Sequence, residues 1–401
     1  MVHIDGTLRK IYAYRALDDF VLMYPFYSVY MAAKGLSIFQ ISTLFILWSV
    51  VDLMTNIPTG VLADKFSRKK LLALGQLLKA ASFVSWFTYP HYAGFALGFA
   101  LWGVGGALTD GTFEALIYDE LKAVQREAEY VKITGRAFSF SLIGDLAATL
   151  TAGVAILLGY GFIFAASIAA ILASSLFVLA LPETPRFEQV ADTRYFSMLR
   201  AGIKEVLHNR ILLAFVGLAG FIGAVYGVLE EYVPLFVRDT GANLSFIAWV
   251  VGVTVGAAAL GSFIAYRYEK LSTVRFMLLL TFAGLLLLIA GASSKVFAVA
   301  LVVGYTFVIR MLKQIYDGKL QHTIGSGLRA TITSVSGFAL ELLAVLAYLL
   351  YGFMADHFSN FRAFAAFGCI VMLVALIYLV VSPRLLSKRE LTHVTETTQN
   401  A

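Results

Sequence analysis

Carboxylate side chains recur inside stretches that are otherwise apolar. Asp110 and Glu114 are four residues apart, which places them on one face of a helix. An ionisable group inside a bilayer is costly unless it meets a partner or an aqueous cavity. Two carboxylates this close repel each other when both are charged, which favours the binding of a proton. We therefore predict proton coupling at this pair, and Asp145 in a neighbouring apolar stretch is a further candidate.

Four charged side chains are candidates for a substrate cavity. Arg310 is the strongest, because a guanidinium group binds a carboxylate through two parallel hydrogen bonds. Lys313 is the second candidate, although Asp317 lies four residues further on and offers it a structural partner. Asp52 and Glu341 each fall in the middle of an apolar stretch, where they either line the cavity or hold helices together.

The acids in the first half of the chain lie near opposite charges. They can therefore have a structural role instead of a role in proton coupling. Arg15 lies three residues before Asp18 and four before Asp19, so an ion pair within one helix is possible. The two aspartates point about 100° apart on a helix, so we expect one of them to reach a cavity. Lys79 can likewise neutralise one member of the Asp110 and Glu114 pair.

The elements that must hold these groups are long apolar helices. Of 401 residues, 60% are hydrophobic and 14% are charged, and the mean hydropathy is +0.81. A soluble domain carries about a quarter charged residues. Apolar runs of about 20 residues recur, as a hydrocarbon core near 30 Å requires. These features predict an all-α polytopic membrane protein. The net charge of +6 fits loops that face an anionic leaflet, so we expect no nucleic-acid partner.

We predict twelve membrane-spanning helices in two groups of six. A polar segment, 182–210, separates the groups and contains an amphipathic stretch from Tyr195 to Leu207, expected at the cytoplasmic surface. The predicted organisation is an N-terminal bundle (1–181), this linker (182–210), a C-terminal bundle (211–382) and a cytoplasmic tail (383–401). The predicted spans are 11–33, 38–63, 70–89, 92–118, 133–159, 161–181, 211–236, 246–266, 275–293, 296–317, 330–356 and 362–382.

The distribution of basic residues predicts the orientation in the membrane. Most of the 31 lysines and arginines fall in segments that are cytoplasmic when both termini are inside. We therefore expect a multi-pass plasma-membrane protein, in a bacterium an inner-membrane protein, with both termini cytoplasmic. The single cysteine, Cys369, allows no disulfide, and the six histidines show no metal-ligand spacing. We expect neither a metal nor another cofactor.

The loop between the second and third predicted spans carries a signature. It runs from Gly60, which lets helices approach closely, through Asp64, which ends the span with a charge, to a basic cluster. The loop resembles the signature between helices 2 and 3 of the major facilitator superfamily, with Ser67 where that family has glycine. The matching residues are Gly60, Leu62, Ala63, Asp64, Lys65, Arg68 and Lys69.

A second copy of this pattern supports the resemblance. The segment 352–359 repeats the Gly, Ala, Asp, Phe and Ser of the loop at the end of the eleventh span, although chance similarity would also account for it. Nested inverted repeats produce such a relation. The resemblance covers essentially the whole chain and implies two six-helix bundles with inverted repeats around a central cavity. It also implies alternating access without enzymatic chemistry.

The resemblance assigns roles to particular residues. It implies a conformational switch that locks the outward-open state, built from Gly60, Asp64, Arg68, Asp119 and Arg136. Asp119 and Arg136 are the expected partners of the Asp64 and Arg68 cluster. Members of the family often carry a functional acid in the first span, which favours Asp19 as a further proton-coupling residue.

The predicted function is secondary active transport, with proton-coupled export of a small amphipathic drug or metabolite. No Gly-x-x-x-x-Gly-Lys-Ser/Thr loop is present, so we expect an ion gradient rather than ATP as the energy source. The expected partners are a small-molecule substrate, protons and the lipid bilayer, and we expect a monomer.

Two features of family antiporters are missing from the chain. The fifth span, 133–159, contains no proline and 99–106 contains no arginine. The sequence is therefore also compatible with a proton-coupled symporter that imports a small organic anion on Arg310. It is compatible as well with a flippase for lipid-linked cargo and with a non-transporting receptor.

Overall fold

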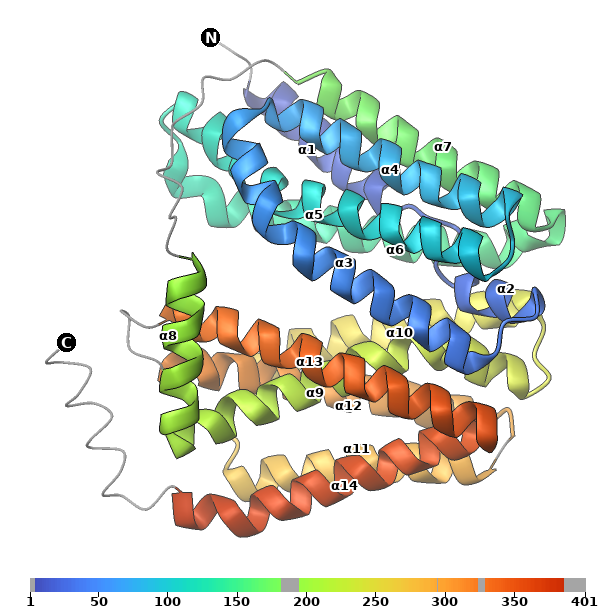
Figure 1. The fold of residues 1–401 in the computed structure, drawn as a ribbon, viewed down its shortest axis with the longest axis vertical. Coiled ribbons are helices and arrows are strands. Elements are labelled where there is room, and N and C mark those ends of the chain that lie inside the picture. Colours follow the sequence, from blue (N-terminus) through green and yellow to red (C-terminus); the bar gives the residue numbers. More distant parts are fainter. Residues whose placement is uncertain (1–3, 182–194, 294, 324–328, 386–401) are drawn as a thin grey trace, which may run out of the picture. The chain divides into compact units, whose positions relative to one another are not determined.

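The computed structural model describes residues 4–181, 195–293, 295–323 and 329–385 (Figure 1). Within these ranges, the side chains of 4–5, 56–65, 195–199, 201, 211, 321–323, 329–331 and 381–385 are left undescribed. The described chain is helical and contains no strand. Helices satisfy every backbone hydrogen bond internally, which a bilayer demands. Among the described residues, 11 helices are long and apolar enough to cross a membrane.

The chain divides into two compact units. The first unit comprises Met1–Ala191 with Asn243–Gly252, and the second comprises Asp192–Ala242 with Val253–Ala401. In the first unit α4 packs on α5 and α7, α3 packs on α5, and α1 packs on α6 and α7. Its helices are α1 (Ile4–Asp18), α2 (Tyr27–Ala33), α3 (Ile38–Lys65), α4 (Arg68–Thr88), α5 (Tyr92–Ala123), α6 (Tyr130–Ala155) and α7 (Tyr160–Leu179).

The second unit contains the remaining helices. Here α11 packs on α12 and α14, and α9 packs on α12 and α13. The short α8 lies across α9 and α13 (Figure 1) and contacts both. The helices are α8 (Tyr195–His208), α9 (Arg210–Asp239), α10 (Leu244–Ile264, which begins in the first unit), α11 (Thr273–Ser293), α12 (Ala298–Thr323), α13 (Arg329–His357) and α14 (Asn360–Leu385).

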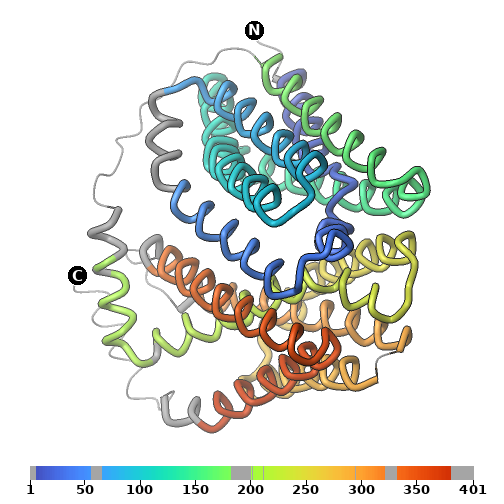
Figure 2. Tube along the Cα trace, turned by 45° about the vertical axis from the view of Figure 1, so that its right-hand side comes forward, coloured from blue at the N-terminus to red at the C-terminus, as the bar shows by residue number. Residues whose placement is uncertain are grey.

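The prediction that 11–33 forms one helix is wrong. The chain leaves the helical path after Asp18 and resumes it at Tyr27 (Figure 2). Pro25 has no N–H to donate and disfavours helical geometry at the residue before it. The Met23 N–H is instead satisfied by the Ser167 hydroxyl of α7 at 3.1 Å. The first span is therefore two helices joined by turns, with Asp18 and Asp19 at the break.

The other predicted spans each correspond to one long helix. With the broken first span they give the predicted all-α fold of twelve spans, which is confirmed. The amphipathic stretch of the linker is also confirmed as a helix, α8. The predicted linker residues 182–194 and the tail from 386 lie outside the described residues.

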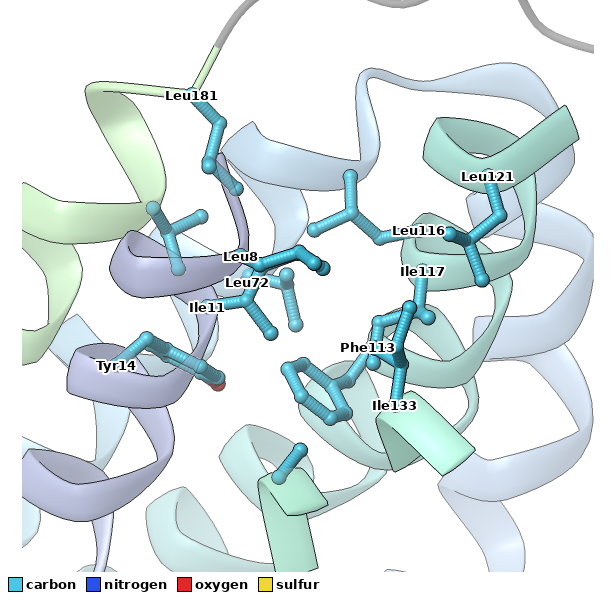
Figure 3. Packing of buried hydrophobic residues seen from close by; sticks show 12 residues of the cluster. Leu8, Ile11, Tyr14, Leu72, Phe113, Leu116, Ile117, Leu121, Ile133 and Leu181 are labelled. Carbon is cyan, nitrogen blue, oxygen red and sulfur yellow. The ribbon is translucent and has the colours of Figure 1, made fainter. Parts of the chain in front are cut away.

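An apolar core ties α1 to four other helices of the first unit. Figure 3 shows Ile11 and Tyr14 of α1 beside Leu72 of α4, with Phe113 of α5 and Ile133 of α6 in the same cluster. These side chains are almost fully buried. The cluster fixes α1 in place, and with it the charged residues near its C-terminal end.

The contact between α1 and α6 depends on Gly144. A Cβ atom built there lies 2.1 Å from the carbonyl oxygen of Ala16. We expect Gly144→Ala to destabilise the protein by about 1–3 kcal/mol, because the two backbones must separate. Gly135→Ala, on the same helix, is the matched control, since nothing lies within 4 Å of that site. Melting temperatures in detergent test this, and an equal effect of both substitutions would contradict it.

Candidate functional site

A charged cluster lies at the C-terminal end of α1, with the buried carboxylate of Asp18 at its centre. The carboxylate accepts hydrogen bonds from Gln76 Nε2 at 2.9 Å, Lys79 Nζ at 3.1 Å and an Arg15 guanidinium nitrogen at 3.3 Å. Three donors, two of them cationic, compensate the loss of hydration of this buried anion. Asp18 is therefore a fixed charge that joins α1 to α4.

Asp19 has a different environment from its neighbour. Its carboxylate accepts a hydrogen bond from the Ser141 hydroxyl of α6 and lies 3.7 Å from the Arg15 guanidinium. The Asp19 side chain is 27% exposed, against 3% for Asp18. The predicted ion pair within the helix is confirmed for Arg15. Asp19 nevertheless keeps access to the surface of the unit.

Lys79 does not form the structural pair with Asp110 or Glu114 that the sequence left open. Lys79 pairs with Asp18, and its ammonium group lies 5.5 Å from the ring centroid of Trp102. Asp110 and Glu114 are both exposed, one turn apart on α5. Neither forms an ion pair with a described residue. Exposed carboxylates on a membrane-spanning helix require an aqueous surrounding.

The two mid-span aspartates of the first unit are half-buried. Asp145 lies on α6, where the Thr149 hydroxyl donates to its backbone carbonyl at 2.8 Å and approaches its carboxylate at 3.5 Å. Asp52 lies on α3 facing α5, and a Cβ atom built at Gly106 lies 3.5 Å from its carboxylate. Asp145 is thus a partly exposed acid on the same helix as Ser141, the partner of Asp19.

Two residues of the predicted conformational switch form an ion pair. Arg68, at the start of α4, is buried, forms an ion pair with Asp119 of α5 and donates to the Ala115 carbonyl. The predicted partnership of Arg68 with Asp119 is therefore confirmed. Arg136 is exposed and forms no ion pair with a described residue. Gly60 and Asp64 lie in α3, in the segment whose side chains are undescribed.

The Arg68 and Asp119 pair gives a testable consequence. Arg68→Met removes the cation of this buried ion pair, at a cost of about 3–5 kcal/mol. We expect turnover of substrate to fall at least about tenfold, and the reversed pair Arg68→Asp/Asp119→Arg to recover part of it. Lys70→Met is the control, since Lys70 is exposed on the same helix. Wild-type turnover in Arg68→Met proteoliposomes would exclude a role for the pair.

The second unit holds the other predicted cavity residues. The Arg310 guanidinium lies 5.1 Å from the ring centroid of Tyr226 and forms no ion pair with a described residue. Lys313 donates to Asp317 at 2.6 Å, so the structural role considered for that lysine is confirmed. Glu341 is half-buried on α13.

Reasoning from sequence missed Gln76 as a partner of Asp18 and did not pair Lys79 with that aspartate. Gln76 is fully buried and donates from the same nitrogen to Asp18 and to the Tyr14 hydroxyl, at 2.9 Å in each case. A signal was present, because Gln76 and Lys79 lie one turn apart in an otherwise apolar span. Polar residues so placed need partners inside the protein.

Comparison with known proteins agrees with this architecture. A family model described as Major Facilitator Superfamily matches residues 11–347. The multidrug resistance protein MdtH of Aeromonas hydrophila is 25% identical over 248 residues, 60% of this chain and 57% of MdtH. A Na(+), Li(+), K(+)/H(+) antiporter of Planococcus maritimus is 24% identical over 244 residues, 55% of each chain. The matched region thus spans less than two thirds of the length of these relatives.

Solved structures match over nearly the full length. The nucleoside transporter NupG superposes with a TM-score of 0.79 at 13% identity, covering 95% of this chain and 99% of NupG. A bacterial homologue of the human lysosomal transporter Spinster gives a TM-score of 0.72 at 14% identity, with 95% and 96% covered. At these identities the likeness concerns the fold. The twelve-span architecture and the family match together show that this chain is an integral, multi-pass membrane protein of the major facilitator superfamily.

Proposed function

We propose that this protein is a secondary transporter that works by alternating access and exports a small amphipathic molecule in exchange for protons. The observation that carries the proposal is the contrast between two sets of acids in the first unit. Asp18 is held by three donors, whereas Asp110 and Glu114 are exposed without an ion-pair partner among the described residues. The first set is structural, and the second is able to bind and release protons.

Asp19, directly after α1, and Asp145 of α6 extend this set of acids. Ser141 donates to Asp19, and Asp145 lies about one turn further along α6, half-buried. The names of two relatives support drug export and exchange for protons separately. One is a multidrug resistance protein, and the other is a Na(+), Li(+), K(+)/H(+) antiporter. We place the protein in the bacterial inner membrane, with both termini cytoplasmic, as a monomer.

A second function is supported by Arg310. Its guanidinium stacks on Tyr226 and has no anionic partner among the described residues. A carboxylate on a substrate would supply that partner through two parallel hydrogen bonds. The second candidate is therefore proton-coupled import of a small organic anion.

The direction of the pH gradient that drives accumulation distinguishes the two functions. An antiporter accumulates substrate in proteoliposomes whose lumen is acidic, because protons leave as substrate enters. A symporter accumulates substrate when the lumen is alkaline. A panel of labelled drugs, metabolites and organic anions should be assayed under both gradients, with a protonophore as control. We expect accumulation with an acidic lumen, and accumulation only with an alkaline lumen would overturn the export proposal.

A further inference from the structure

A small pocket lies inside the second unit, between α9, α10, α12 and α14. Its volume is about 10 Å³, which is room for about one water-sized species. Aliphatic and aromatic side chains form much of the wall. The polar residues that line it are Tyr226, Glu230, Thr254, Tyr305 and Thr306.

The Tyr305 hydroxyl indicates that this pocket has an occupant. The side chain is 2% exposed, and its hydroxyl has no hydrogen-bond partner among the described residues. A buried hydroxyl left without a partner costs about 1–3 kcal/mol. Since Tyr305 lines the pocket, a species bound there can supply the missing contact.

The polar groups around the pocket are all oxygen atoms. Thr254 and Thr306 are each 6% exposed, so their hydroxyls lie deep in the unit. Thr306 donates its hydrogen to the Val302 carbonyl at 3.0 Å, which leaves the oxygen lone pairs as acceptors. Glu230 is exposed, so the pocket has an accessible side, and that side carries a negative charge.

Charge, donor type and size together define the ligand. One carboxylate with neutral oxygens matches a single positive charge, whereas divalent ions prefer several carboxylates. Oxygen donors suit hard cations and hydrogen-bond to ammonium groups. Arg310 does not line the pocket, and its guanidinium lies 5.1 Å from the ring centroid of Tyr226. A volume of about 10 Å³ fits a single ion or an ammonium group.

We propose that this pocket binds a small monovalent cation between the Glu230 carboxylate and the hydroxyl oxygens of Thr254, Tyr305 and Thr306. The cation is either an alkali ion or the ammonium group of an organic amine, which share this chemistry. The site lies within the second unit. It does not depend on the direction of transport or on the proton-coupling acids of the first unit.

Thermal unfolding of the purified full-length protein tests the site. A ligand that binds only the folded state raises the melting temperature in a saturable way. Choline chloride should be replaced stepwise by sodium, potassium, lithium or methylammonium chloride at constant ionic strength. We expect at least one of these cations to stabilise the wild type saturably. In Glu230→Gln and in Tyr305→Phe the half-saturating concentration should rise at least about tenfold.

Two neighbouring substitutions provide matched controls. Glu231→Gln changes the next residue of α9, which does not line the pocket. Tyr378→Phe removes a hydroxyl that contacts Tyr316 elsewhere in the unit. Both controls should respond like the wild type. If Glu230→Gln fails to fold, Thr254→Val removes one oxygen at nearly constant shape and should give the same loss.

The responses to the different salts distinguish the two classes of ligand. A response to alkali ions alone identifies an ion site, and a response to methylammonium alone identifies an amine subsite. Equal melting temperatures in all salts would overturn the proposal. An unchanged half-saturating concentration in both Glu230→Gln and Tyr305→Phe would also overturn it.

Discussion

Replacing Lys79 with methionine is expected to lower the melting temperature of the protein by about 10 °C. Lys79 and Asp18 form a buried ion pair at 3.1 Å, and removing one partner of such a pair costs about 3–5 kcal/mol. In a unit of this size 1 kcal/mol corresponds to about 2–4 °C. Arg15 and Gln76 remain as hydrogen-bond donors to Asp18 in the variant. The Asp18 carboxylate nevertheless loses one of its two cationic partners.

A double variant separates the lost charge from lost packing. Lys79→Met/Asp18→Asn has no uncompensated buried charge, so it should regain part of the melting temperature. Lys132→Met is the control, because Lys132 is exposed on α6 and forms no ion pair with a described residue. A Lys79→Met protein as stable as the wild type would show that Asp18 does not depend on this partner.

Neutralising Asp110, Glu114 or Asp19 in the first unit is expected to suppress accumulation driven by a pH gradient. Asp110→Asn, Glu114→Gln and Asp19→Asn each imitate the protonated carboxyl group permanently. The variants should still exchange labelled for unlabelled substrate down the gradient of the labelled substrate. This exchange does not require the carboxyl group to release a proton. Uphill accumulation should fall at least about tenfold in one or more of them. Both fluxes are measured in the same proteoliposomes.

A matched control is available for this set. Glu205 lies on α8, outside the predicted spans, and is exposed. Glu205→Gln should keep both fluxes. Full accumulation in all three variants would remove these acids from the proton path and leave Asp145, Asp52 and Glu341 to be tested.

Hydropathy predicted the fold because the bilayer imposes length and composition on every span. It missed the break in the first span, since 11–33 is apolar enough to suggest one helix. The break depends on Pro25 and on a tertiary contact, the hydrogen bond from Met23 to Ser167, 144 residues away in the chain. Helical spacing alone cannot identify a partner on another helix.

In the site too, contacts within one helix could be predicted from the spacing of residues in the sequence, whereas contacts between helices could not. Pairs within one helix followed from spacing, as with Arg15 and Asp18 or Lys313 and Asp317. The partner of Lys79 could not be predicted from spacing, because α1 and α5 both carry acids that could reach this lysine. The packing of the helices decides that Lys79 pairs with Asp18. The family resemblance indicated Arg68 and Asp119, which do pair.

The most direct test of the proposed function measures proton movement during transport. Proteoliposomes loaded with a transported substrate and a pH-sensitive dye are diluted into substrate-free buffer. We expect efflux to acidify the lumen, because protons enter in exchange, and we expect the signal to be lost in the Asp110, Glu114 or Asp19 variants. Efflux that makes the lumen alkaline, or that moves no protons, would contradict proton-coupled export.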